Sequence, residues 1–122
     1  MNEIGRQRLC GYLDHVIQAI ERIHSYVENL DESTFLRDPR TQDAVIRNFE
    51  IIGEACNNVT RHFPHYADEH PEIPWRFAYE MRNVLAHGYF KVDLEIVWRT
   101  IHRELPPLHQ QIRDLLAALP AP

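Results

Sequence analysis

Long stretches of this chain repeat apolar residues at helical spacing, and shorter segments rich in proline and acidic residues separate them. In residues 3–30 an apolar side chain recurs every three or four positions, which is the period of an amphipathic helix. Polar residues occupy the opposite face. The segment predicts a long first helix whose buried stripe consists of Leu9, Leu13, Val16, Ile17, Ile20, Ile23, Val27 and Leu30.

A break follows this first helix. In it Asp31, Ser33 and Asp38 are candidate helix caps, and Pro39 suits the first turn of the next helix. Residues 40–62 then resume the helical period. The stripe expected to be buried in this second helix consists of Val45, Phe49, Ile52, Cys56 and Val59.

The rest of the chain predicts further helices joined by proline-containing segments. Residues 63–74 form a connector that ends at Pro74, which suits the start of a third helix ending near Gly88. Asp93 begins a fourth helix, and Pro106-Pro107 should break or kink the chain before a last one. The apolar positions of these helices are Trp75, Phe77, Ala78, Met81 and Leu85, then Ile96, Val97, Ile101 and Leu105, then Leu108, Ile112, Leu115, Leu116 and Leu119. The pattern indicates an all-α up-and-down bundle of four to five helices.

Composition fits a single globular domain spanning residues 1–122. The formal net charge is −5 and the pI is about 5.9, which argues against a broad surface that coats nucleic acid. Net charge does not exclude a small basic site. Cys10 and Cys56 form no CxxC pair and are interpreted as reduced, half-buried packing residues. The chain shows no signal core and no membrane-spanning run, so a cytoplasmic protein is expected.

The candidate chemistry is concentrated in Arg82, His87 and Tyr89. Arginine offers a planar fork of donors that fits a phosphate, histidine can transfer a proton near neutral pH, and tyrosine adds a hydroxyl. In a straight helix the five-residue step from Arg82 to His87 turns the side chains ~140° apart. The helix must therefore end or bend before both reach one phosphate, which Gly88 permits.

Residue types alone also allow structural roles for these three side chains. Arg82 would then form a surface salt bridge to Glu80 or Glu54, His87 would cap a helix, and Tyr89 would belong to the core. These alternatives stay open at the level of residue types.

The other histidines carry weaker signals. His62, His65 and His70 share one connector with acidic neighbours, but their spacing matches no strong metal-binding pattern, and no metal site or cofactor is expected. The histidines on helical segments are interpreted as solvated or capping residues: His15, His24, His102 and His109.

Residues 81–90, Met-Arg-Asn-Val-Leu-Ala-His-Gly-Tyr-Phe, resemble the signature of the HEPN superfamily and, within it, the HepT toxin family. Stretches elsewhere are similar to the same family, so that the likeness covers nearly the whole chain. These stretches are residues 47–55, 73–76, 96–101 and 105–108.

The resemblance implies a HEPN-like helical domain and a metal-independent ribonuclease that acts as the toxin of a prokaryotic toxin–antitoxin pair. It implies a homodimer that joins two Arg-x4-His motifs in one cleft and cleaves an RNA such as tRNA or mRNA. Arg82 and His87 would be catalytic, and Asn83 would assist by binding phosphate. The implied antitoxin is an MntA-like nucleotidyltransferase that uses ATP to attach AMP to Tyr89 and so blocks the cleft.

Two further expectations accompany this resemblance. Arg47, Arg76 and Arg82 are hypothesised to shape a local positive cleft, which would reconcile an acidic chain with an RNA substrate. The alternative function is a noncatalytic HEPN binding module that serves as the substrate-binding partner of a minimal nucleotidyltransferase.

Overall fold

A computed structural model describes residues 1–76, 80 and 93–120. Its helices are α1 (Glu3–Val27), α2 (Glu32–Phe35), α3 (Pro39–His62), α4 (Pro64–Glu69), α6 (Leu94–Arg103) and α7 (Leu105–Ala118). The described residues contain no strand, and the predicted all-α helical bundle is confirmed. None of the described helices is long and apolar enough to cross a membrane.

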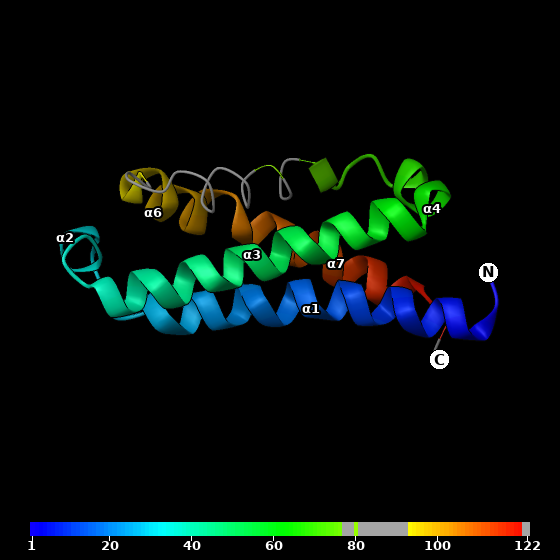
Figure 1. Cartoon of the computed structure of the whole chain (residues 1–122), viewed down its shortest axis with the longest axis horizontal. Helices are drawn as coiled ribbons and strands as arrows, with labels where there is room; N and C mark the ends of the chain where they lie inside the picture. The colour runs from blue at the N-terminus through cyan, green and yellow to red at the C-terminus, as the bar shows by residue number, and fades with distance from the viewer. Residues whose placement is uncertain (77–79, 81–92, 121–122) are drawn as a thin grey trace.

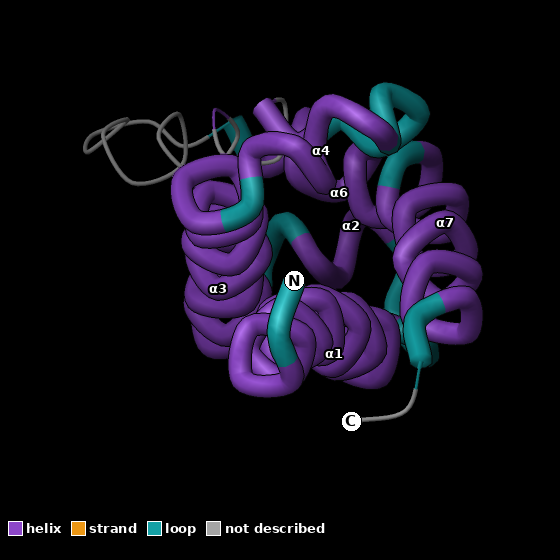
Figure 2. Tube along the Cα trace, turned by 90° about the vertical axis from the view of Figure 1, so that its right-hand side faces the viewer, coloured by secondary structure: helices purple, strands orange, loops and turns teal. Residues whose placement is uncertain are grey.

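The bundle is built around α1. Helices α1 and α3 lie side by side along the long axis of the molecule (Figure 1). Seen end-on, α3 and α7 flank α1, and α6 closes the opposite side of the core (Figure 2). The apolar stripes predicted for the first two helices face this core. Each of their positions is buried except Leu30, which lies beyond the end of α1 and is half-buried.

Side-chain caps fix the starts of α1, α2 and α3. The Asn2 side chain accepts the Gly5 N–H at 2.7 Å and begins α1. Asp31 accepts the Thr34 N–H at 2.8 Å and Asp38 accepts the Thr41 N–H at 3.2 Å, which confirms both as caps. Pro39 occupies the first turn of α3, as predicted. Ser33 is not a cap, because it lies inside α2, where Asp31 already performs that role.

Two short helices were not predicted. The break after α1 contains the single turn α2, and the proline-containing connector contains α4. Both are too short to show a helical period in the sequence. Phe35 explains the stability of α2, because its ring is fully buried and lies 5.2 Å from the Trp98 ring, centroid to centroid.

The C-terminal helices differ from the prediction in two details. Helix α7 begins at Leu105, ahead of the two prolines, because the first turn of a helix needs no N–H from Pro106 or Pro107. Ile96 is 43% exposed and does not belong to the buried face of α6. Thr100 takes a buried position instead, and its hydroxyl donates to the Ile96 carbonyl at 2.8 Å.

The two cysteines are free, and they differ in burial. Cys10 is half-buried, as predicted, whereas Cys56 is completely buried in α3. Desolvation raises the pKa of the Cys56 thiol to about 12. Cys56 is therefore a packing residue of the core and stays protonated at neutral pH.

Candidate functional site

The residues of the sequence motif, Arg82, Asn83, His87 and Tyr89, lie outside the described residues. The structure shows the chain on both sides of the motif, up to Arg76 and from Asp93 onward, with Glu80 between. The described parts of the structure that bear on the motif are therefore these two flanks and the hollows on the surface of the bundle.

Trp75 anchors the chain to the bundle just before the motif. Its side chain is only 7% exposed, and its indole Nε1–H donates to the His70 carbonyl at 3.2 Å. Ile73, 2% exposed, packs in the core one residue before Pro74. The Gln111 side-chain amide of α7 donates to the Glu72 carbonyl at 3.1 Å. These contacts fix the position from which the chain enters the motif.

The chain after the motif is fixed by Asp93, the N-cap of α6. One of its carboxylate oxygens accepts the backbone N–H groups of Glu95 at 3.1 Å and Ile96 at 3.2 Å. Helix α6 is held in turn by its buried residues and by the contact of Trp98 with Phe35. Both flanks of the motif are therefore held by packing and hydrogen bonds to the bundle.

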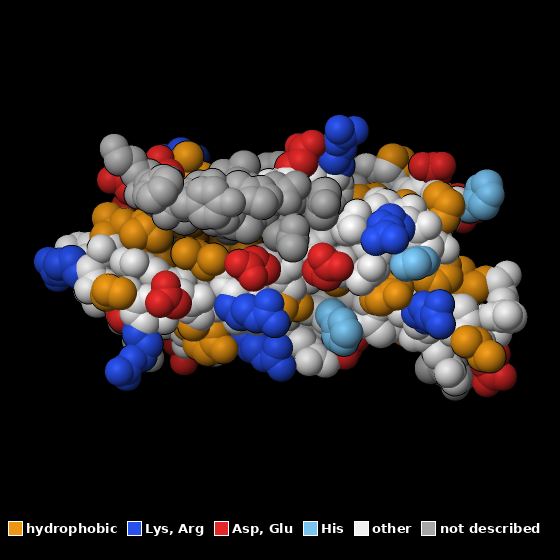
Figure 3. Space-filling model, in the orientation of Figure 1, with side chains coloured by type: hydrophobic (Ala, Val, Ile, Leu, Met, Phe, Trp, Pro, Cys, Tyr) orange, Lys and Arg blue, Asp and Glu red, His pale blue; other side chains and the backbone are white. Residues whose placement is uncertain are grey.

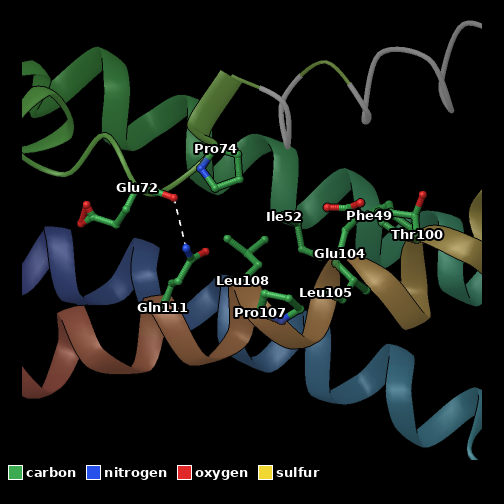
Figure 4. Close-up of a pocket in the computed structure, with 10 residues that line it drawn as sticks. All are labelled: Phe49, Ile52, Glu72, Pro74, Thr100, Glu104, Leu105, Pro107, Leu108 and Gln111. Carbon is green, nitrogen blue, oxygen red and sulfur yellow. Dashed lines mark hydrogen bonds between the residues drawn. The ribbon is translucent and has the colours of Figure 1, made fainter.

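A cavity of about 230 Å³ lies between α3, the connector and the start of α7 (Figure 4). Its lining combines apolar groups with two carboxylates: Phe49, Ile52, Glu72, Pro74, Thr100, Glu104, Leu105, Pro107, Leu108 and Gln111. Among the described residues no arginine, lysine or histidine lines it. A lining that holds two carboxylates and no described cation does not suit the backbone of a nucleic acid.

A second hollow of about 320 Å³ lies between α1 and α3 and is polar. We call it the α1–α3 groove; its lining residues are His15, Arg47, Glu50, Ile51, Glu54, Ala55 and Asn58. Arg47 forms an ion pair with Glu50 at 3.6 Å. Basic side chains and histidines follow α1 and α3 on this face, with acidic groups above them in the view of Figure 3.

The sequence pattern did not indicate the α1–α3 groove. His15 is exposed, as predicted for a solvated residue, but the sequence did not indicate that its side chain also contributes to a groove wall. The available signal was the spacing of Arg8, His15 and Arg22, which stand seven residues apart and therefore share one flank of α1.

Two of the three arginines of the hypothesised positive cleft, Arg47 and Arg76, belong to the described residues. Arg47 and Arg76 are 70% and 89% exposed, and each pairs with a nearby glutamate. Arg76 Nε lies 2.9 Å from a carboxylate oxygen of Glu80. Exposed pairs of this kind are weak and exchange readily for another anion. Arg82, the third member of the cleft, lies outside the described residues.

Of the three histidines predicted to share a connector, His62 lies at the end of α3, and His62 and His70 have separate partners. His62 stacks on Tyr12, with 6.3 Å between ring centroids, and His70 pairs with Glu72 at 3.0 Å. Within the described part of the chain no group of three or more histidine, cysteine, aspartate or glutamate side chains is arranged to hold a metal ion. The helical residue His109 pairs with Glu21 at 2.9 Å and so joins α7 to α1.

Comparison with known proteins places this sequence in a family. The family model described as "Ribonuclease HepT-like" matches residues 16–115, which include the whole motif. A protein of Thermococcus cleftensis named "Probable ribonuclease HepT" is 41% identical over 104 residues, covering 85% of this chain and 92% of that protein. No solved structure matches the chain.

Two further relatives carry similar names. A protein of Caldanaerobacter subterraneus subsp. tengcongensis named "Putative RNase" is 36% identical over 105 residues, covering 86% of this chain and 91% of its own length. A protein of Methanocaldococcus jannaschii named "Gamma-glutamylcyclotransferase and putative RNase" is 37% identical over 108 residues, which cover 88% of this chain but 47% of that protein. The expected resemblance is confirmed: this chain belongs to the ribonuclease HepT-like family of the HEPN superfamily.

Proposed function

We propose that this protein is a metal-independent ribonuclease and that Arg82 and His87 are its catalytic residues. The observation that carries the proposal is the family match over residues 16–115, which spans both side chains. The names of the relatives support ribonuclease activity, because each similar protein reported above is named as an RNase. The all-α bundle supports it further, because it is the fold that the resemblance implies.

The chemistry follows from the two residue types. Histidine can act as a general acid or base as a phosphodiester bond of RNA is broken, because its proton exchanges near neutral pH. Arginine stabilises the negative charge that develops on the phosphoryl oxygens during the reaction. Asn83 is proposed to hold the phosphate with its amide. The anchored flanks at Trp75 and Asp93 support these roles, because small displacements of catalytic groups are costly.

The test is cleavage of bulk RNA and tRNA in the presence of EDTA. Purified protein with unmodified Tyr89 is compared with the variants His87→Ala and Arg82→Gln. Wild-type protein should cleave RNA while both variants leave it intact. The matched control is His102→Ala, because His102 is an exposed histidine on α6 whose described hydrogen bond is with the Trp98 carbonyl of the same helix. Intact RNA with the wild-type protein would contradict the proposal and favour the noncatalytic binding module.

We further propose that the protein is the toxin of a toxin–antitoxin pair and that Tyr89 is its regulatory site. A nucleotidyltransferase antitoxin would join the Tyr89 oxygen to the α-phosphate of ATP and release pyrophosphate. The attached phosphodiester would place negative charge beside Arg82 and His87 and repel the RNA backbone. The family assignment supports this proposal.

The test incubates the protein with ATP and an MntA-like nucleotidyltransferase, followed by intact-mass measurement and the RNA assay. The mass should rise by whole AMP units while cleavage is lost. Tyr89→Phe should keep its mass and its activity. AMP addition to Tyr89→Phe would place the modified residue elsewhere.

We propose that the active form is a homodimer in which two copies of the motif share one cleft. The resemblance to the HepT family supports this proposal, and a composite cleft would double a sparse set of basic residues. Light scattering coupled to size-exclusion chromatography should give twice the mass of the 14.5 kDa chain. A monomer that cleaves RNA at full rate would contradict it.

A further inference from the structure

We propose that the α1–α3 groove binds a single strand of RNA and guides it along the surface of the bundle. The inference rests on the proposed ribonuclease function and adds to it a binding path outside the motif. The residues that carry it are Arg8, His15 and Arg22 on α1, and Arg47, Asn58 and His62 on α3.

A row of nitrogen-bearing side chains follows α1, and one of its members, His15, lines the groove itself. Arg8, His15 and Arg22 recur every seven residues, so that they lie on one flank of the helix. His15 lines the groove, which identifies this flank as the one facing α3. At 1.5 Å per residue the row spans ~21 Å, enough for several nucleotides of a single strand.

The α3 wall completes the path. Arg47 and Asn58 line the same hollow as His15, and His62 lies one helical turn beyond Asn58. Because α1 and α3 run in opposite directions, His62 comes beside the N-terminal part of α1, where it stacks on Tyr12. Figure 3 shows basic groups and histidines along this face, over both helices, with acidic groups beside them.

Two carboxylates, Glu50 and Glu54, line the groove together with Arg47, and the positive charge of the path therefore depends on Arg8 and Arg22 beside it. Arg8 and Arg22 are exposed, and within the described part of the chain neither has an acidic side chain at ion-pair distance. Arg47 pairs with Glu50 on the solvent-exposed surface, where such a pair is readily replaced by a phosphate. Phosphate groups are the anions that such a row binds through charge and counterion release.

One end of the path also offers rings on which bases can stack. The rings of Tyr12 and His62 are stacked at an interplanar angle of 23°, and the Phe63 ring meets Tyr12 edge-on, with 6.3 Å between centroids. Proteins that hold single strands combine a basic groove with aromatic platforms of this kind. A double helix would not present unstacked bases to these rings, so the geometry favours a single strand.

Gly11 provides a sharp way to test the path. It lies on α1 between Arg8 and His15, and a Cβ built on it meets no described neighbouring atom within 4 Å. A larger residue therefore fits without displacing the core, and loss of a mid-helix glycine favours the helix. Gly11→Glu and Gly11→Lys are a matched pair of similar size that differ by two units of charge.

The experiment measures binding of a fluorescein-labelled oligouridine by anisotropy, with both Gly11 variants made in a His87→Ala background to prevent cleavage. Gly11→Lys should bind about tenfold more tightly than Gly11→Glu, and the ratio should shrink as salt is raised. The control pair is Ser33→Glu and Ser33→Lys on α2, at the opposite end of the molecule from the N-terminus (Figure 1). These two should bind the oligonucleotide alike.

Equal binding of the oligonucleotide by the two Gly11 variants would contradict the proposed RNA-binding path. So would a change of oligomeric mass in Gly11→Glu, because the groove would then be a contact between copies of the chain. Cleavage of the same oligonucleotide by the protein with native His87 is measured separately. Its absence would contradict the ribonuclease proposal, whereas cleavage together with equal binding would contradict only the path.

Discussion

The indole nitrogen of Trp75 lies 3.2 Å from the carbonyl oxygen of His70 and donates a hydrogen bond to it. This bond closes the connector into a compact loop just before the chain enters the motif. The Trp75 ring is buried at the same time, so one side chain both packs in the core and satisfies a backbone carbonyl. The loop conformation and the core are therefore coupled at this residue.

Replacing Trp75 by Phe tests that coupling. The smaller ring keeps most of the packing but cannot donate to the His70 carbonyl, so the free energy of unfolding should fall by about 1–3 kcal/mol. Urea denaturation followed by circular dichroism measures the change. Arg76→Gln is the matched control, because this neighbouring side chain is 89% exposed and its ion pair with Glu80 contributes little. Equal midpoints for both variants would show that the hydrogen bond is not important for stability.

Phe35 should contribute to stability far beyond what a one-turn helix suggests. Its side chain is completely buried against Trp98, so Phe35→Ala should lower the free energy of unfolding by about 3–5 kcal/mol. Phe35→Leu, which refills most of the volume, should cost less. Urea denaturation gives the energies, and Trp98 fluorescence reports the local packing. A loss below that of an exposed substitution on α2, such as Ser33→Ala, would contradict the packing role.

Acid should weaken the N-terminus of α3 through Asp38. Hydrogen bonds from the Thr41 hydroxyl and the Thr41 N–H lower the pKa of the Asp38 carboxyl below its usual value of 3.8. The folded pKa lies below the unfolded one, so the stabilisation is complete above 3.8 and is lost as the pH falls through the lower folded value.

The variant Asp38→Asn isolates this contribution. Asparagine still accepts the capping bond but does not titrate, so the urea midpoint of the variant should fall less than that of wild type between pH 6 and pH 3. Asp43→Asn serves as the control, because Asp43 is an exposed residue inside α3 and caps no helix. The same acid sensitivity in wild type and Asp38→Asn would rule out this carboxyl as a source.

The two cysteines should differ sharply in reactivity. Burial raises the pKa of Cys56 to about 12 and shields its sulfur, whereas Cys10 is half-buried. Native protein treated with iodoacetamide near pH 8 should therefore be alkylated at Cys10 alone, and urea-denatured protein at both positions. Peptide mass mapping identifies the modified residue. Modification of native Cys56 as fast as Cys10 would show that the core opens around it.

The sequence predicted the long helices because their buried stripes are periodic and because Asp31 and Asp38 carry the right side chains for caps. It did not predict α2 and α4, since one or two turns give no measurable period. The burial of Thr100 in place of Ile96 depends on how α6 rests on its neighbours. That is a tertiary property, and local periodicity does not record it.

For the candidate site, too, the sequence predicts one part and the fold is needed for the other. Arg82, His87 and Tyr89 stand out from a contiguous motif, and they remain predictions because they lie outside the described residues. The α1–α3 groove depends on two helices that lie side by side, so that His15 meets Arg47 and Asn58 across a large gap in sequence. The spacing of Arg8, His15 and Arg22 indicates a shared flank, but the fold decides that this flank faces α3.

The contact between Glu21 and His109 joins residues 88 positions apart, and α7 packs along the flank of α1 that α3 leaves uncovered. During synthesis α1 and α3 can pair as soon as both have left the ribosome. Among the described elements it is α7 that covers the remaining flank of α1, so this flank stays exposed until α7 emerges. Until then the nascent chain presents apolar surface that favours aggregation and chaperone binding. The described bundle can form only after α7 has left the ribosome.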